Sequence, residues 1–178
     1  MSAHTVFDYA TAYDIMVGRW SGMTTTYDAK GEYVDSVASL VTMYWKKPHT
    51  LLHYEQEELS DLDDVLRNNP HKVAVANIVR HKFDLRIAGK SCSSEQNEEN
   101  VKCVGAETSP GIYLFHLYFP KFGHYYNNQY FTNPNERHII GPFVPNQTYD
   151  PQFIVAQTFT RISYDVPEEY KRGLRRKR

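Results

Sequence analysis

The sequence lacks the motifs that mark the common nucleotide-dependent and hydrolytic enzymes. It has no Gly-x-Ser-x-Gly run, no Gly-x-x-x-x-Gly-Lys loop and no Gly-x-Gly-x-x-Gly fingerprint. Serine hydrolysis, nucleotide hydrolysis and NAD chemistry are therefore poorly supported. No His-x-His pair or third ligand stands at a usual metal spacing, which argues against a metal site. We expect neither a cofactor nor a metal.

The chain also has no run of the roughly 18 apolar residues that a membrane span needs. Its first residues show no basic stretch followed by an apolar one, so no secretory signal is recognisable and a cytoplasmic location is expected. Only two cysteines are present, Cys92 and Cys103, on either side of a polar stretch typical of a hairpin loop. They could face each other and close a disulfide, or stay reduced in the cytoplasm. Without a Cys-x-x-Cys pair they make a poor zinc site.

Positive charge is scarce except at the end of the chain. The net charge is −1, yet six of the last eight residues are Lys or Arg, so the rest of the chain is clearly acidic. We expect one domain over residues 1–170 and a basic, disordered tail over 171–178. Such a tail could contact nucleic acid or an anionic membrane, but it is more typical of a solubilising end. The acidic body argues against nucleic acid as the main partner, whereas a homodimer is possible.

What the sequence does have is a regular series of short runs rich in Val, Ile, Thr, Tyr and Phe, separated by turn residues. This pattern is typical of a β-sandwich or a β-barrel. It predicts strands over 19–27, 37–45, 51–59, 73–87, 101–108, 112–119, 125–132, 137–144 and 153–164. Helical spacing over 6–17 and an N-cap serine with acidic residues over 60–67 predict two short helices. The fold class is all-β, a single antiparallel barrel of 8–10 strands with a short N-terminal helix.

One motif carries a family resemblance. Gly18-Arg19-Trp20 stands where the first expected helix gives way to the first strand, and Arg161 lies in the last strand. This resembles the Gly-x-Trp opening of the lipocalins and the wider calycin superfamily. The resemblance implies a short helix before the motif, a Trp20 that seals the barrel floor, and an Arg161 that packs across the indole ring. Both residues are expected to be structural.

The usual Thr-Asp-Tyr loop motif of the family is absent, as is a secretion signal. The resemblance therefore points to the cytosolic branches, such as the bilin lyases and other lipocalin-like enzymes. If Trp20 faces inward, so do Gly22, Thr24 and Thr26, because side chains alternate along a strand. Small inward residues leave space, so these three are expected to line a cavity and contact a ligand.

Four side chains are candidates for acid–base chemistry. His53 and Glu55 share one face of a strand, which is either an inward cluster or a solvated outer face. His116 is a polar residue in a strand that is apolar on both faces, where it could be a satisfied core histidine or a catalytic group. Tyr126 lies in the aromatic and amide-rich segment 120–130, which suits either a pocket rim or a hairpin with cross-strand aromatic pairs.

Other residues are candidates for ligand binding. An inward Arg86 would suit a substrate carboxylate through paired hydrogen bonds, whereas an outward one would only be solvated. Three tyrosines, Tyr44, Tyr118 and Tyr130, complete the set of expected ligand contacts.

These residues allow three classes of function, of which the expected cytoplasmic location and polar-aromatic interior favour the first. One is a cofactor-free lyase, isomerase or cyclase that binds a small hydrophobic or planar molecule and transforms it by side-chain acid–base chemistry. Another is a passive carrier of a pigment or lipid-like molecule, and a third is an interaction module that uses the basic tail. Convergence of two or more of His53, Glu55, Arg86, His116 and Tyr126 in one cavity would support the enzyme. A smooth apolar cavity would support the carrier, and a filled barrel the interaction module.

Overall fold

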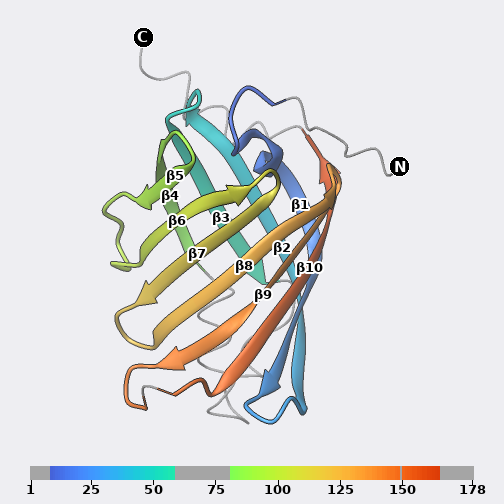
Figure 1. Cartoon of the computed structure of the whole chain (residues 1–178), viewed down its shortest axis with the longest axis vertical. Helices are drawn as coiled ribbons and strands as arrows, with labels where there is room; N and C mark the ends of the chain where they lie inside the picture. Colours follow the sequence, from blue (N-terminus) through green and yellow to red (C-terminus); the bar gives the residue numbers. More distant parts are fainter. Residues whose placement is uncertain (1–8, 59–80, 149, 165–178) are drawn as a thin grey trace.

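A computed structural model describes residues 9–58, 81–148 and 150–164 of the chain. The described residues form a closed antiparallel barrel of ten strands (Figure 1). The strands are β1 (Gly18–Asp28), β2 (Tyr33–Lys47), β3 (Leu51–Glu58), β4 (His81–Ala88), β5 (Ser91–Ser94), β6 (Lys102–Ser109), β7 (Ile112–Phe119), β8 (Gly123–Asn133), β9 (Glu136–Pro145) and β10 (Phe153–Ser163). The all-β barrel expected from the spacing of the β-rich runs is therefore confirmed.

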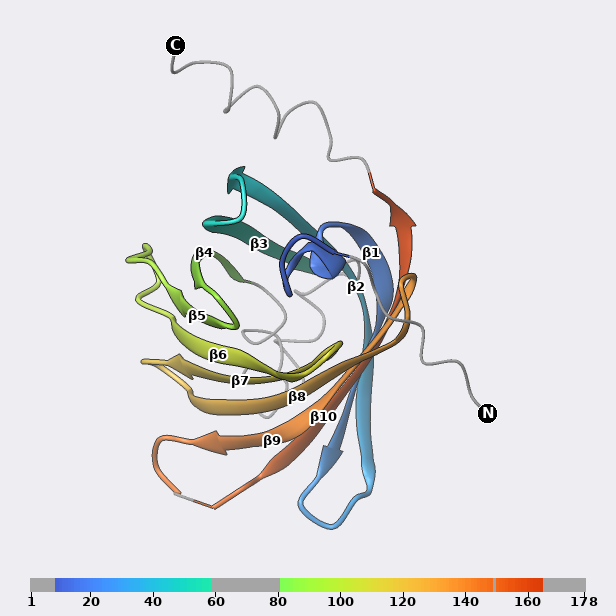
Figure 2. The ribbon, with the colours of Figure 1, turned by 45° about the horizontal axis from the view of Figure 1, so that its top comes forward.

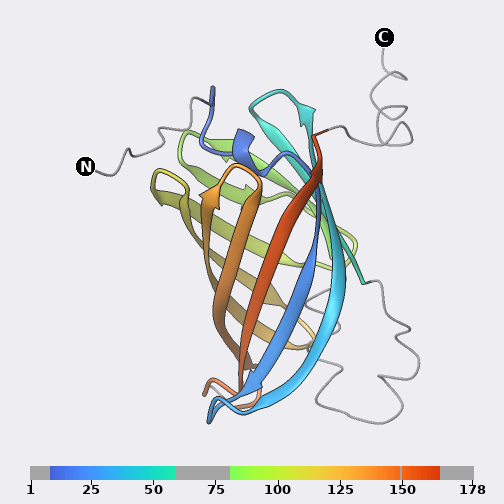
Figure 3. The same cartoon turned by 90° about the vertical axis from the view of Figure 1, so that its right-hand side faces the viewer.

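Each strand pairs with its neighbours in the sequence, and the barrel closes where β1 pairs with β10. In that seam Trp20 is opposite Arg161 and Thr24 is opposite Gln157. Strands β1, β2, β9 and β10 are long, and Figure 3 shows them running the height of the barrel along one side. Closure satisfies the backbone groups that an open sheet would leave exposed along its edges.

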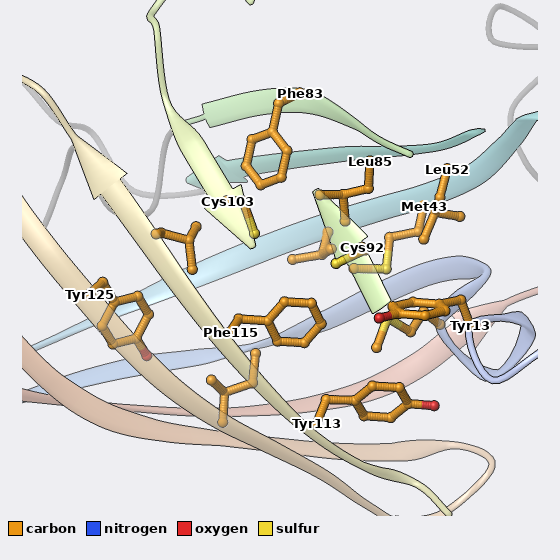
Figure 4. Packing of buried hydrophobic residues seen from close by; sticks show 14 of the residues in the cluster. Tyr13, Met43, Leu52, Phe83, Leu85, Cys92, Cys103, Tyr113, Phe115 and Tyr125 are labelled. Carbon is orange, nitrogen blue, oxygen red and sulfur yellow. The ribbon is translucent and has the colours of Figure 1, made fainter. Parts of the chain in front are cut away.

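The core lies inside the barrel, because inward and outward side chains alternate along each strand. On β7, for example, Tyr113, Phe115 and Leu117 are buried, whereas Leu114 between them is about half exposed. Figure 4 shows inward rings and sulfur-containing side chains from several strands gathered in this interior. Both faces of β7 carry apolar side chains, as the sequence indicated, but only the inward face is buried in the core.

The N-terminal helix expected over 6–17 is not formed in the described part of that range. Only a 3-10 turn, η1 (Asp14–Met16), is present, and it lies across one end of the barrel (Figure 2). Its carbonyls are used elsewhere: Met16 accepts a hydrogen bond from Trp20 Nε1, and Ile15 accepts one from Arg161 Nη2. A segment this short gains little from helical propagation, so these tertiary contacts decide its conformation.

Strand β5 was not predicted from the sequence, because the residues around it were expected to form a turn and a loop. Its residues are mostly serine, which gives a weak strand signal. The expected helix over 60–67 and residues 73–80 of an expected strand lie outside the described residues, as does the basic tail over 171–178. No helix within 9–58, 81–148 or 150–164 is long and apolar enough to cross a membrane.

Candidate functional site

The barrel interior contains a narrow cavity, in which the centres of water-sized molecules can occupy about 40 Å³. Inward side chains from β2, β3, β4 and β6 to β10 form its wall, and Met16 of η1 closes one side. The described lining residues are Met16, Met43, Tyr54, Gln56, His81, Phe83, Leu85, Cys103, Phe115, Leu117, Tyr125, Asn127, Gln129, Ile139 and Gln157. The wall is mainly apolar and aromatic, with a few polar groups, which is the usual composition of a small-molecule site.

Three amide side chains in this wall carry buried atoms that have no hydrogen-bond partner. These atoms are Gln56 Nε2, Asn127 Oδ1 and Gln129 Nε2. A buried polar atom without a partner costs about 1–3 kcal/mol, so native proteins rarely retain one without a use for it. The fourth amide of the wall, Gln157, is paired through its Nε2 with Thr24 Oγ1 at 2.9 Å. The unpaired atoms in the cavity wall are thus two nitrogen donors and one oxygen acceptor.

Aromatic rings form much of the remaining wall. The His81 ring lies parallel to Phe83, with 5.3 Å between centroids and an interplanar angle of 6°, and it also stacks on Tyr54 at 5.3 Å. Ring faces of this kind favour a planar or apolar ligand.

The cavity tyrosines keep their protons. Burial raises the pKa of Tyr54 to about 12, against a smaller lowering by Arg137, and its hydroxyl donates to Gln56 Oε1. Burial also raises the pKa of Tyr125, whose hydroxyl donates to the Val155 carbonyl oxygen at 3.5 Å. Both hydroxyls are hydrogen-bond donors at neutral pH and poor bases.

Cys103 lies in the cavity wall and Cys92 is buried beside it, and both are free thiols. The strand pairing places Cys92 opposite Gly105 rather than opposite Cys103. The pKa of Cys103 is raised, first by a hydrogen bond with Cys92 and then by burial. The two cysteines therefore contribute to the core as buried thiols.

The closed end of the barrel is built around Trp20, which is fully buried. Arg161 lies over its indole with the guanidinium carbon 4.0 Å from the ring centroid, in the position that the lipocalin resemblance implies. Arg161 also donates to the carbonyl oxygens of Ile15, Val17 and Pro134. A second guanidinium, that of Arg137, lies 5.2 Å from the same ring. Arg137 was not expected from the sequence.

Gly22, Thr24 and Thr26 belong to the inward face of β1, but none of them is among the described residues that line the cavity. A Cβ on Gly22 would lie 2.7 Å from the Phe159 ring. Phe159 therefore occupies the space that the small residue leaves. Thr24 is likewise covered, since it is hydrogen-bonded to Ser39 and Gln157.

His53 and Glu55 lie on the outer face of β3, because Leu52, Tyr54 and Gln56 occupy the inner one. His53 is nevertheless only 8% exposed and belongs to an outer cleft with Lys46 and Asp84. Its Nδ1 is 2.6 Å from Asp84 Oδ1, and its Nε2 is 3.7 Å from Glu55 Oε2. The expected pairing of His53 with Glu55 is present, but outside the cavity.

Lys46 and Tyr44 complete this outer cluster. Lys46 Nζ is 2.7 Å from Asp84 Oδ2, and the Tyr44 ring lies 4.8 Å from the His53 ring. Burial raises the pKa of the Asp84 carboxyl, but hydrogen bonds from Lys46 and His53 outweigh it, so the pKa is below its ordinary value. The cluster is therefore an ionic network that joins β2, β3 and β4.

His116 and Tyr126 also lie on the outer face, across β7 and β8. Their rings are stacked at 4.5 Å, and His116 Nε2 is 2.9 Å from His124 Nδ1. Burial and then His124 lower the pKa of His116. Tyr126 is 44% exposed, and Tyr118 stacks on His124 at 4.7 Å. These are cross-strand aromatic pairs, one of the two interpretations that the segment allowed.

The two remaining expected ligand contacts are also outside the cavity. Tyr130 stacks on His138 at the outer face of β8 and β9. Arg86 has a side chain that is 69% exposed, and its Nε is 2.5 Å from Glu95 Oε1. The structure therefore does not bring His53, Glu55, Arg86, His116 and Tyr126 together in one cavity.

On β3 and β8, the residues that line the cavity are the sequence neighbours of the predicted site residues. Gln56 follows Glu55, and Asn127 and Gln129 flank the outward Asn128 between Tyr126 and Tyr130. Both faces of β8 carry polar and aromatic side chains, so its pattern does not show which face is inward. The pairing of β8 with the inward residues of β7 supplies that information: Gln129 is opposite Tyr113 and Asn127 is opposite Phe115.

No protein-family model and no curated protein matches the chain significantly. Solved structures do match it. A DUF3598-family protein of unknown function from Nostoc punctiforme has a TM-score of 0.61 at 9% identity over 84% of this chain. This chain spans 48% of that protein.

Two further structures are similar over most of both chains. The S-type phycobiliprotein lyase CPES from Guillardia theta has a TM-score of 0.53 at 11% identity, covering 87% of this chain and 91% of its own. The protein Rv2717c from M. tuberculosis has a TM-score of 0.55 at 12% identity, covering 86% and 99%. At these identities the similarity defines the fold: the chain is a lipocalin-like barrel.

Proposed function

We propose that this protein binds a small, largely apolar molecule with hydrogen-bonding groups inside the barrel. The observation that carries the proposal is the set of unpaired buried amide atoms of Gln56, Asn127 and Gln129 in an otherwise aromatic wall. A ligand that pairs with these atoms removes the cost of their burial. Its apolar surface is also removed from water by contact with the aromatic rings, which favours binding. The bilin lyase among the similar structures fits a barrel that accommodates a small molecule.

Binding is better supported than acid–base catalysis. The described residues of the cavity wall include no carboxylate, and the tyrosines Tyr54 and Tyr125 have raised pKa values. The candidate catalytic residues His53, Glu55, His116 and Tyr126 lie on the outer face, so they cannot touch a molecule bound inside. The amides can hold and orient a ligand but exchange no proton with it at neutral pH.

A matched pair of substitutions on β7 tests whether the interior is the binding site. Leu117 faces the cavity, and Leu114 on the same strand faces outward and is 47% exposed. We expect N-phenyl-1-naphthylamine, a neutral aromatic probe, to bind the native protein, and Leu117→Trp to weaken it by roughly tenfold or more, since the larger ring fills the site. Fluorescence titration measures this.

Leu114→Trp is the control, since it adds the same ring outside the barrel, and urea unfolding checks that both variants are folded. Absence of saturable binding to the native protein would contradict the proposal. So would equal weakening by the two variants. A second substitution, Gln129→Leu, is expected to weaken 1-naphthamide more than N-phenyl-1-naphthylamine, because only the first probe carries an amide that can pair with Gln129.

A further inference from the structure

Arg137 is a buried cation that has no acidic partner within 9–58, 81–148 or 150–164. It lies on β9, its side chain is 0% exposed, and no ion pair joins it to an acidic residue among those described. Its guanidinium carbon lies over two rings, 5.2 Å from the Trp20 centroid and 4.7 Å from that of Phe159. Burial lowers the pKa of Arg137, and the neighbouring cation Arg161 lowers it further.

The edge of this guanidinium is also unsatisfied. Nη1 has one weak acceptor, Met43 Sδ at 3.6 Å, and neither Nε nor Nη2 has a partner. Ring faces stabilise a cation through its plane, but they accept no hydrogen bond from its edge. Nε–H and one N–H of Nη2 point the same way, in the fork that binds both oxygens of a carboxylate.

The guanidinium of Arg137 lies next to a residue of the cavity wall. Met43, which contacts Nη1, is part of the cavity wall, and so is Ile139, the next inward residue of β9. In the strand pairing Ile139 is opposite Gln129 on β8 and Gln157 on β10. Arg137 therefore lies one layer of side chains below the amides, toward Trp20. Arg137, Gln129 and Gln56 each carry a buried nitrogen donor that has no hydrogen-bond partner.

We propose that the ligand carries a carboxylate, which Arg137 binds at the closed end of the barrel while the apolar body of the ligand lies among the cavity rings. This inference rests on the proposed function and adds to it the chemical class and the orientation of the ligand. The carboxylate supplies the acceptors that Nε and Nη2 lack and gives the guanidinium an anionic partner. Gln129 Nε2 is the neighbouring donor that adds a further hydrogen bond.

Two probes of the same shape separate charge from fit: 1-naphthoate, which is anionic, and 1-naphthamide, which is neutral. Isothermal titration calorimetry at neutral pH is expected to give the native protein at least about tenfold higher affinity for 1-naphthoate, the size expected of charge-assisted hydrogen bonds. Arg137→Met keeps an apolar side chain in the floor but removes the donors. It is expected to abolish this preference while retaining 1-naphthamide binding.

The stability of the same variant separates a binding role from a purely structural one. A cation that lacks an acceptor costs energy when buried, so Arg137→Met is expected to raise the urea midpoint of the free protein. If Arg137 is only a stacking element of the floor, the midpoint falls and the preference for 1-naphthoate survives the substitution. That pair of results would overturn the inference.

A measurement on the native chain guards against a variant that fails to fold. In the ¹⁵N spectrum, the Nε–H signal of Arg137 is expected to shift on addition of 1-naphthoate and to stay unchanged with 1-naphthamide. Equal binding of the two probes inside the barrel, or a shift with neither, would refute the carboxylate while leaving the proposed function intact. Absence of binding by both probes would count against the proposed function itself.

Discussion

At the scale of single residues, the buried polar groups of this barrel divide into those with partners and those without. Arg161 is buried and donates to three backbone carbonyls, so it completes the closed end. Arg137 is buried against the same indole and lacks such acceptors. The two arginines lie on the inward faces of neighbouring strands, so the contrast between them is one of hydrogen bonding, and it is the basis for the proposed ligand role of Arg137.

Asp84 provides a prediction at this scale, because its pKa is lowered by Lys46 and His53 despite burial. A carboxyl whose pKa is lower in the folded state stabilises the fold above its unfolded pKa, and this contribution is lost as the pH falls through the folded value. Asp84→Asn is therefore expected to lower the free energy of unfolding at neutral pH and to flatten its fall below about pH 4.

Urea unfolding at a series of pH values measures this effect. Glu32→Gln, at an exposed turn position, is the control and should leave the acid profile as it is in the native protein. An Asp84→Asn profile that runs parallel to the native one would show that the outer ionic cluster does not contribute to stability.

The candidate site also shows what could be inferred from single residues. Trp20 and Arg161 were expected at the barrel floor because a local motif and a late arginine suffice to suggest them. Glu55 and Tyr126 were predicted as site residues, whereas their neighbours Gln56 and Asn127 line the cavity. Telling the two pairs apart requires knowing which face of each strand is inward. A shift of one residue exchanges the two faces, and only pairing with neighbouring strands fixes it. Arg137 carried no signal, since an arginine in a strand is usually solvated.

At the scale of elements, the spacing of turn residues was enough to predict most of the strands. The expected run over 112–119 coincides with β7, and those over 137–144 and 153–164 differ from β9 and β10 by one residue at one or both ends. Alternating β-branched and aromatic residues make such strands recognisable. The short serine-rich β5 was missed, because its place in the barrel depends on pairing with β4 and β6 rather than on its own residues.

The 3-10 turn η1 and the end of β10 depend on each other through Arg161, which joins the carbonyls of Ile15 and Val17 to that of Pro134. A lysine keeps the charge but cannot reach three acceptors in a plane. Arg161→Lys is therefore expected to lower the free energy of unfolding by about 3 kcal/mol, the cost of leaving buried carbonyls without donors.

Urea denaturation measures the loss, with Arg86→Lys as the matched control. Arg86 is mostly exposed and paired only with Glu95, so its replacement should change stability little. Equal effects of the two substitutions would show that Arg161 does not hold the end of the barrel together.

At the scale of the whole molecule, ten strands enclose an interior that is neither filled nor purely apolar. Strand number alone favours room for a small ligand. The polar groups are unevenly placed: the amides lie in the cavity wall among aromatic rings, and Arg137 lies against Trp20 at the closed end. The lipocalin-like fold and the interior position of the site follow from the strand pattern, whereas the identity of the contacting residues follows from the register.

The outer face carries an aromatic set that the strand pattern could equally have placed inside. His116, Tyr126 and Tyr130 lie there, with Leu114 and Ile140 exposed between them. A molecule that bound to this surface instead of the cavity would contact His116 and Tyr126, two of the four residues predicted to be catalytic, and Tyr130, a predicted ligand contact. The central claim is therefore a claim about which face of the barrel wall receives the ligand.

The most direct test is an NMR titration of ¹⁵N-labelled native protein with 1-naphthoate, following the side-chain amide signals. We predict saturable shifts for the amide groups of Gln56, Asn127 and Gln129, and none for Asn128, which is exposed on the outer face of the same strand. Saturable shifts at Asn128 with unchanged signals from the three cavity amides would contradict the account. Such a result would place the binding surface outside the barrel.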